Sequence, residues 1–196
     1  MNYLAHAYLS FNKPALLVGN MISDFVKGKK KFDYPSDVLD GINLHRAIDD
    51  FTDMHPATKS ARQIFQPEYG LYSGAFMDIA YDYFVANDKT LYEPESLEVF
   101  SQQVYDTLDQ YIDIFPPQFV KLFPSMKKHN WLLNYRNDTG IQRSFEGLVY
   151  RASFMSDSGP AFNLFLNNKN ELQEAYHLFF PDLIRFTRNY ISSKSL

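Results

Sequence analysis

The 196-residue chain has no cysteine, which excludes disulfides, thiolate metal sites and cysteine nucleophiles. It also lacks any apolar run near the roughly 20 residues that a membrane-spanning helix requires. Its first residues lack the basic start of a signal peptide, and Lys13 and Pro14 soon interrupt their apolar character. We therefore expect a soluble cytoplasmic protein without a membrane partner.

The chain has no excess of positive charge either. It contains 19 Lys and Arg residues and 23 Asp and Glu residues, which gives a net charge of −4. This balance argues against a protein that coats nucleic acid. One short segment differs, with four lysines within five residues: Lys27, Lys29, Lys30 and Lys31. Such a run is ordinarily a solvated loop, and the alternative is a docking patch for an anionic substrate or an acidic partner.

Common phosphate-binding and nucleophile motifs are also missing. The sequence has no Walker A loop, dinucleotide glycine fingerprint, serine-nucleophile elbow or His-Glu-x-x-His. If the protein acts on a phosphate ester, metal ions and basic side chains must therefore hold the anion.

Strand signals are absent, whereas apolar residues recur every three or four positions, as between Ser96 and Phe115. We expect an all-α fold in which residues 1–196 form one domain, a bundle of many helices. Pro181 predicts a kink in the last helix. The expected helices run from Pro14 to a left-handed glycine cap at Gly28, from Ser36 to Met54, and over about 70–87, 94–114, 116–135, 139–156 and 170–190.

Aromatic side chains are plentiful, at 17% of the chain, with 14 Tyr and 18 Phe. Most are expected to fill the core between helices, because large rings bury much area there. The rest can line a groove for a long, thin ligand.

Acidic and histidine side chains occur on segments that are otherwise apolar. Asp24 lies in one such segment and His6 in another. A buried carboxylate must be paired, hydrogen-bonded or bound to a cation, because burying it bare is costly. His45, Asp49 and Asp53 follow one another at intervals of four, so they share one helical face.

Asp78 and Asp82 share a face of another expected helix, where like charges repel unless a metal, an arginine or a proton relieves them. Each feature alone has an ordinary explanation, since a lone histidine is usually a core residue and an acid pair usually faces solvent. Three such features on separate helices, without cysteine, favour a metal site of oxygen and nitrogen ligands. That ligand set suits Mn²⁺, Mg²⁺ or Fe²⁺ better than structural zinc.

Four motifs, in this order along the N-terminal part of the chain, resemble the acyl carrier protein phosphodiesterases. They are Met1-Asn-x-Leu-Ala-His6, Gly19-Asn20-x-x-x-Asp24-Phe25-Val26-Lys27-Gly28, Gly41-x-x-x-His45-Arg46-x-Ile48-Asp49-x-x-Thr52-Asp53 and Asp78-x-x-x-Asp82-x-Phe84. Tyr83 departs from the pattern, which leads us to expect a histidine there. The family is in turn distantly similar to the helical HD phosphohydrolases, but Arg46 follows His45 where an HD protein carries Asp.

The resemblance implies hydrolysis of the phosphodiester that joins 4′-phosphopantetheine to a serine of holo-acyl carrier protein, with a divalent cation, often manganese, as cofactor. On this hypothesis four residues hold the cation: His6, Asp24, His45 and Asp78. Asp49 or Asp82 orients or deprotonates the attacking water, and Arg46 binds the phosphate. The acidic carrier docks on the segment from Lys27 to Lys31.

Two other classes stay open at this point. One is an HD-type phosphohydrolase that acts on a nucleotide or another small phosphoester, which would not need the basic patch. The other is a helical binding module without catalysis, in which arginines neutralise the buried acids: Arg62, Arg136, Arg143 and Arg151.

Overall fold

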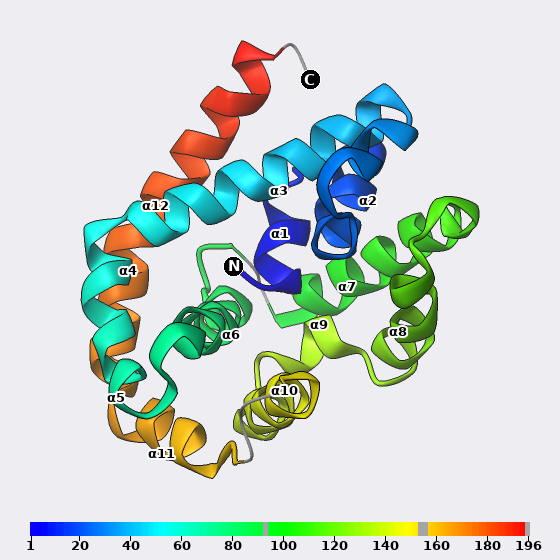
Figure 1. Cartoon of the computed structure of the whole chain (residues 1–196). Helices are drawn as coiled ribbons and strands as arrows, with labels where there is room; N and C mark the ends of the chain where they lie inside the picture. The colour runs from blue at the N-terminus through cyan, green and yellow to red at the C-terminus, as the bar shows by residue number, and fades with distance from the viewer. Residues whose placement is uncertain (92–93, 153–156, 195–196) are drawn as a thin grey trace.

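The computed structural model describes residues 1–91, 94–152 and 157–194, and for residues 94 and 95 only the backbone. Throughout these ranges the regular structure is helical and no strand occurs, which confirms the all-α class (Figure 1). The longer helices are α3 (Ser36–Met54), α6 (Ser73–Asn87), α7 (Pro94–Asp109), α8 (Pro117–Lys128), α10 (Asp138–Arg151) and α12 (Lys169–Ser193).

Shorter elements connect and cover these helices. The short α-helices are α1 (Tyr3–Tyr8), α2 (Pro14–Ile22), α4 (Pro56–Ala61), α5 (Gln66–Tyr69), α9 (Trp131–Asn134) and α11 (Gly159–Asn167). The 3₁₀ turns are η1 (Ser23–Phe25), η2 (Gly28–Asp33), η3 (Arg62–Ile64), η4 (Gly70–Tyr72) and η5 (Ile112–Ile114). No described helix combines the length and the apolarity that a membrane span requires.

Several helix ends differ from those expected. The helix from Pro14 ends at Ile22 rather than near Gly28, although Gly28 does adopt the positive φ, 56°, of a left-handed glycine. The helix expected over 116–135 breaks at Asn130, whose φ of 42° no α-helix accepts. The helix expected over 139–156 ends at Arg151, and residues 153–156 lie outside the described residues.

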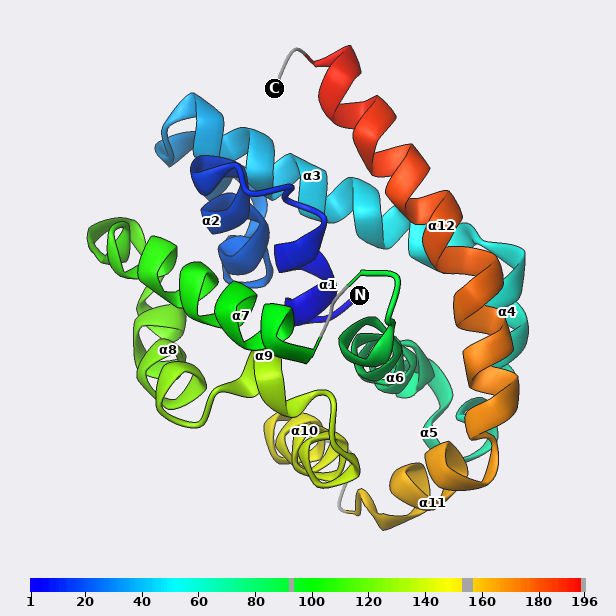
Figure 2. The ribbon, with the colours of Figure 1, turned by 180° about the vertical axis from the view of Figure 1, so that it is seen from behind.

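Prolines account for two helices that were not expected, α4 and α11. Pro56 and Pro160 stand in the first turn of these helices, where a missing N–H costs nothing and the fixed φ favours a helix start. Pro181 lies inside α12, which continues through it and changes direction along its length in Figure 2, in keeping with the expected kink.

Helix α1 lies at the centre of the molecule in both views, with α2, α3, α6, α7 and α9 around it (Figures 1 and 2). Leu4 and Ala5 are completely buried, and His6 is 2% exposed. The first polar side chain of the expected site therefore lies in the core, on a helix of only six residues.

Two glycines set how closely α2 packs against α3. A Cβ at Gly19 would lie 2.0 Å from the carbonyl oxygen of Val38, and one at Gly41 would lie 2.4 Å from that of Leu16. No side chain larger than the hydrogen of glycine fits at either position. Close packing of the two helices therefore explains the glycine at the start of the second and of the third motif. This close crossing brings the end of α2 beside His45 on α3.

Candidate metal centre

Three side chains from two helices converge in the core. The ligating atoms of His6, His45 and Asp49 all lie within 4.8 Å of one another. Asp49 comes one helical turn after His45 on α3, and its two oxygens face different rings. Its Oδ1 lies 3.2 Å from His6 Nε2, and its Oδ2 lies 3.1 Å from His45 Nε2.

The ring of His45 is oriented by the main chain of α2. Its Nδ1 lies 2.8 Å from the carbonyl oxygen of Asn20, which can only accept, so Nδ1 carries the hydrogen. Its Nε2 faces Asp24 Oδ1 at 3.1 Å and also Asp49. Burial disfavours the charged ring, but the hydrogen bonds and negative charges of Asp24 and Asp49 outweigh burial and raise the pKa of His45 to about 9.

His6 is the least satisfied polar group of this cluster. Within the described residues neither ring nitrogen has a hydrogen bond, since Nε2 is near Asp49 without the alignment that one needs. Burial, together with the positive charge of His45, lowers the pKa of His6 to about 4, so this ring is neutral at pH 7. A buried nitrogen without a partner costs about 1–3 kcal/mol. A cation on Nε2 would remove that cost.

Both nearby carboxylates are ionised at neutral pH. Burial opposes the charge of Asp49, but the Met1 amino group and the two histidines hold its pKa well below the ordinary value. Desolvation beside the histidines also opposes the charge of Asp24, although its side chain is 65% exposed, and the hydrogen bond from His45 outweighs it and lowers the pKa. Two imidazoles and a carboxylate therefore form a donor set that fits a divalent cation.

The structure places two expected ligands outside this group. Asp24 touches only His45 among its members, and its side chain is 65% exposed. Asp78 lies beside the amino group of Met1, whose nitrogen is 3.0 Å from Asp78 Oδ1 and 3.2 Å from Asp49 Oδ1. Asp49, expected to act on the water, is instead a member of the group.

Asp82, the other residue expected to act on the water, caps helix α1. Its Oδ2 accepts a hydrogen bond from the Leu4 backbone at 2.7 Å, and its Oδ1 accepts one from Ala5 at 3.2 Å. Asp82 is completely buried, and burial raises its pKa to about 7 against the effect of these bonds. Both oxygens of Asp82 serve the backbone of the helix that carries His6, and the role expected for it at the water stays a prediction.

Tyr83, the departure from the family pattern, packs elsewhere. Its ring lies 5.2 Å from that of Phe165, and Lys169 Nζ lies 4.3 Å from its centroid. In the part of the chain that the structure describes, it is not a member of the metal-binding group.

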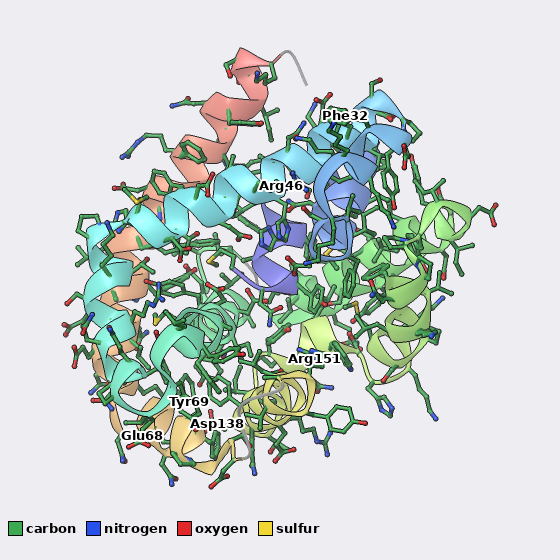
Figure 3. The ribbon with its side chains drawn as sticks, in the orientation of Figure 1. Phe32, Arg46, Glu68, Tyr69, Asp138 and Arg151 are labelled. Carbon is green, nitrogen blue, oxygen red and sulfur yellow. The ribbon has the colours of Figure 1, made fainter. Side chains whose placement is uncertain are left out.

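Two basic side chains connect α3 to the segment that follows Asp24. Arg46 Nη2 donates to the Val26 carbonyl oxygen at 3.1 Å, and Lys31 Nζ donates to Asn43 Oδ1 at 2.9 Å. In Figure 3, Phe32 lies at the N-terminal end of α3 and Arg46 lies further along it. The remaining lysines of the segment, Lys27, Lys29 and Lys30, are exposed.

In the described part of the chain, arginines do not neutralise the acids of the centre. Among the described residues, no ion pair joins an arginine to Asp24, Asp49 or Asp78, and Arg62 only approaches Asp53, at 3.9 Å. The interpretation as a binding module with arginine-paired acids has no support in this geometry.

Asn20 is a residue of the site that our expectations missed. Besides accepting from His45, it donates through Nδ2 to the carbonyl oxygen of His6 at 2.9 Å. It thus connects both histidines. A buried asparagine one turn before Asp24, in an apolar segment, was the signal that could have identified it.

Comparison of the sequence with known proteins supports the resemblance that the motifs indicated. The sequence model of the family described as "Acyl carrier protein phosphodiesterase" matches residues 1–183. A relative of that name from Klebsiella pneumoniae subsp. pneumoniae is 29% identical, and one from Enterobacter sp. (strain 638) is 30% identical, each alignment covering 96% of this chain and 98% of the relative. One from Salmonella paratyphi A is 30% identical, over 94% of this chain and 96% of the relative. No solved structure shows a significant match. The chain belongs to the acyl carrier protein phosphodiesterase family.

Proposed function

We propose that the protein is a metal-dependent phosphodiesterase that removes 4′-phosphopantetheine from holo-acyl carrier protein. The observation that carries the proposal is the convergence of His6, His45 and Asp49, with the nitrogens of His6 buried and without hydrogen bonds. The family match and the names of the relatives give the substrate class.

His6, His45 and Asp49 would hold the cation, for which their nitrogen and oxygen donors suit Mn²⁺, with Mg²⁺ and Fe²⁺ as alternatives. A divalent cation bound there would lower the pKa of a water and polarise the phosphoryl group. The hydrogen bond from His45 Nδ1 to the Asn20 carbonyl oxygen fixes the orientation of the ring and would leave Nε2 available to the cation.

In this proposal we exchange the roles expected for Asp24 and Asp49, because Asp49 and not Asp24 belongs to the group. Asp24 is more exposed than Asp49, at 65% against 40%, and it borders the group on the side of His45. In our proposal its carboxylate orients the attacking water and accepts its proton. Asp78 lies outside the group, and the Met1 amino group between Asp78 and Asp49 offsets the repulsion of the two carboxylates.

Arg46 contributes to phosphate binding in this proposal. Its guanidinium carries five N–H donors, and the bond to Val26 uses one of them. The others remain for the nonbridging oxygens of the phosphate, where a planar fork gives two parallel hydrogen bonds.

The proposed reaction breaks one bond and forms one. The water oxygen attacks phosphorus, and the bond from phosphorus to the serine oxygen breaks. One proton of the water passes to Asp24, the serine oxygen takes up a proton from solvent, and Asp24 then releases its proton to solvent, so that the enzyme returns to its starting state. The products are apo-acyl carrier protein and 4′-phosphopantetheine.

The exposed lysines beside the centre give the carrier a place to dock. Lys27, Lys29 and Lys30 lie in the segment directly after Asp24, so a carrier bound there has its serine near the site. Positive charge on this rim attracts an acidic partner and mainly speeds encounter.

Parallel assays on two substrates separate this function from the alternatives. Chelator-treated protein receives Mn²⁺ together with either holo-acyl carrier protein or a nucleotide phosphoester. We expect conversion of the carrier only. Turnover of the nucleotide alone would favour the HD-type alternative, and turnover of neither would reject both enzymatic functions.

A further inference from the structure

A pocket of about 290 Å³ opens between α1, α9 and α10. None of the residues to which the proposed function gives a role lines it. Its volume is close to the lower end of the range for small-molecule sites, about 300–1,000 Å³. Tyr3 and Trp131 form one wall, with ring centroids 6.3 Å apart, and Tyr135 lies beside them. Gly140, Ser144 and Gly147 follow one face of α10, where small side chains leave the space open.

Two arginines also line the pocket, Arg143 and Arg151. Within the described residues neither forms an ion pair with a carboxylate. Both are exposed side chains, and Arg151 lies between α10 and α1 in Figure 3. The pocket therefore offers aromatic walls together with unpaired positive charge, a combination suited to a ligand with an apolar body and an anionic end.

Tyr3 connects the pocket to the metal centre. It comes three residues before His6 on α1, so the two side chains lie on neighbouring parts of one face. Besides burial, two charges act on the Tyr3 hydroxyl: the Asp24 carboxylate raises its pKa, and the Arg151 guanidinium lowers it. Tyr3 thus lies within electrostatic range of both sites.

We propose that this pocket holds the pantetheine arm of the substrate, with the phosphate end toward Arg151 and the metal centre. The proposal rests on the function proposed above and names where the arm binds. The gem-dimethyl and methylene groups of the arm pack on Tyr3 and Trp131, and its amides meet polar groups such as Ser144. Arg143 and Arg151 attract the phosphate.

The glycines of α10 supply variants that separate pocket filling from misfolding. A Cβ at Gly147 would meet only Arg151 Nη1, at 3.4 Å, so a larger side chain there enters the pocket without displacing backbone. A Cβ at Gly140 would lie 1.9 Å from the Asn134 carbonyl oxygen, so this position is unsuitable. Gly74 on α6 provides the control, since its Cβ would meet only Arg62, at 3.5 Å, outside the pocket.

Trp131 is the only tryptophan of the chain, so its fluorescence reports directly on the pocket. The full-length protein is titrated with 4′-phosphopantetheine and, separately, with inorganic phosphate. We expect a saturable change in Trp131 emission with the first ligand and none with the second. Gly147→Leu should weaken binding about tenfold or more, whereas Gly74→Leu should bind like wild type.

Arg143→Ala gives an independent test if Gly147→Leu fails to fold. We expect about tenfold weaker binding of 4′-phosphopantetheine, because a charge-assisted contact is lost, and no change in Arg136→Ala, an exposed arginine outside the pocket. Unchanged emission of the wild type, or wild-type binding by both pocket variants, would overturn the proposal. Carrier hydrolysis without a Trp131 response rejects the pocket alone, and a saturable response without hydrolysis rejects the proposed function alone.

Discussion

The imidazole rings of His6 and His45 stack on each other, with centroids 3.9 Å apart and planes inclined by 11°. Two charged rings at this distance would repel each other, and their pKa values move in opposite directions, to about 4 for His6 and about 9 for His45. The pair therefore carries one positive charge in a cation-free protein at pH 7. A divalent cation would take the place of the proton on His45 Nε2.

Asparagine substitutions at Asp49 and Asp24 test which carboxylate binds the metal. Asp49→Asn should lose the ion, because the amide removes the anionic member of the group at nearly constant volume. Asp24→Asn should keep the ion and lose about 100-fold or more in kcat, as expected for loss of a general base. Metal content by elemental mass spectrometry and steady-state rates measure the two effects. If Asp24→Asn purifies without metal while Asp49→Asn retains it, the exchange of roles is wrong.

The stability of the cation-free protein should depend on the protonation of His45. Its folded pKa of about 9 lies above the ordinary value of about 6.5, so its contribution is complete below pH 6.5 and is lost as pH rises to 9. Urea denaturation of chelator-treated protein should give a midpoint that falls across this window. His45→Gln, which cannot titrate, should flatten that slope. An equally steep slope in the variant would assign the pH dependence to other groups.

The sequence could largely predict which residues meet at the centre, but not the arrangement on which their proposed roles depend. His6, His45 and Asp49 were all expected at the site, because polar side chains on apolar segments need partners. The proposed roles depend on how α2 packs against α3 at Gly19 and Gly41. The spacing of residues within one helix does not predict how two helices pack.

The contacts of Asp82 could not be predicted from the sequence either. The four-residue spacing correctly put it on one face with Asp78, but nothing in the sequence placed the start of α1 against that face. The predicted helix over 116–135 was wrong for a local reason. Asn130 adopts a left-handed conformation that asparagine tolerates but does not require, so the sequence does not reveal the break.

Charge reversal at the exposed lysines tests the docking surface. Lys29→Glu with Lys30→Glu should raise KM for holo-acyl carrier protein about tenfold at low salt and leave kcat unchanged, because these side chains steer encounter. Lys31 is left intact, since it bonds Asn43.

The effect of this reversal should shrink at physiological salt, where screening acts beyond about 8 Å. Lys59→Glu with Lys121→Glu changes the net charge equally at exposed sites elsewhere and should not alter KM. Equal effects of the two pairs would show that net charge alone matters and that the segment has no docking role.

A methyl group at Gly41 tests the close crossing of α2 and α3. Gly41→Ala should lower the free energy of unfolding by about 1–3 kcal/mol, because the new Cβ would lie 2.4 Å from the Leu16 carbonyl oxygen. Gly147→Ala, whose Cβ has room, should be neutral or stabilising by up to about 1 kcal/mol. Thermal unfolding followed by circular dichroism compares the two. Equal midpoints would mean that α2 and α3 can separate at little cost.

The intact mass of the carrier tests the central claim most directly. Chelator-treated wild-type protein is incubated with holo-acyl carrier protein in heavy-oxygen water, with and without Mn²⁺, and both products are weighed by mass spectrometry. We predict that the carrier loses 4′-phosphopantetheine only when Mn²⁺ is present, and that the heavy oxygen appears in the phosphate of the released product. A carrier that keeps its mass with Mn²⁺, or loses the group equally without any divalent cation, would contradict the proposed metal centre.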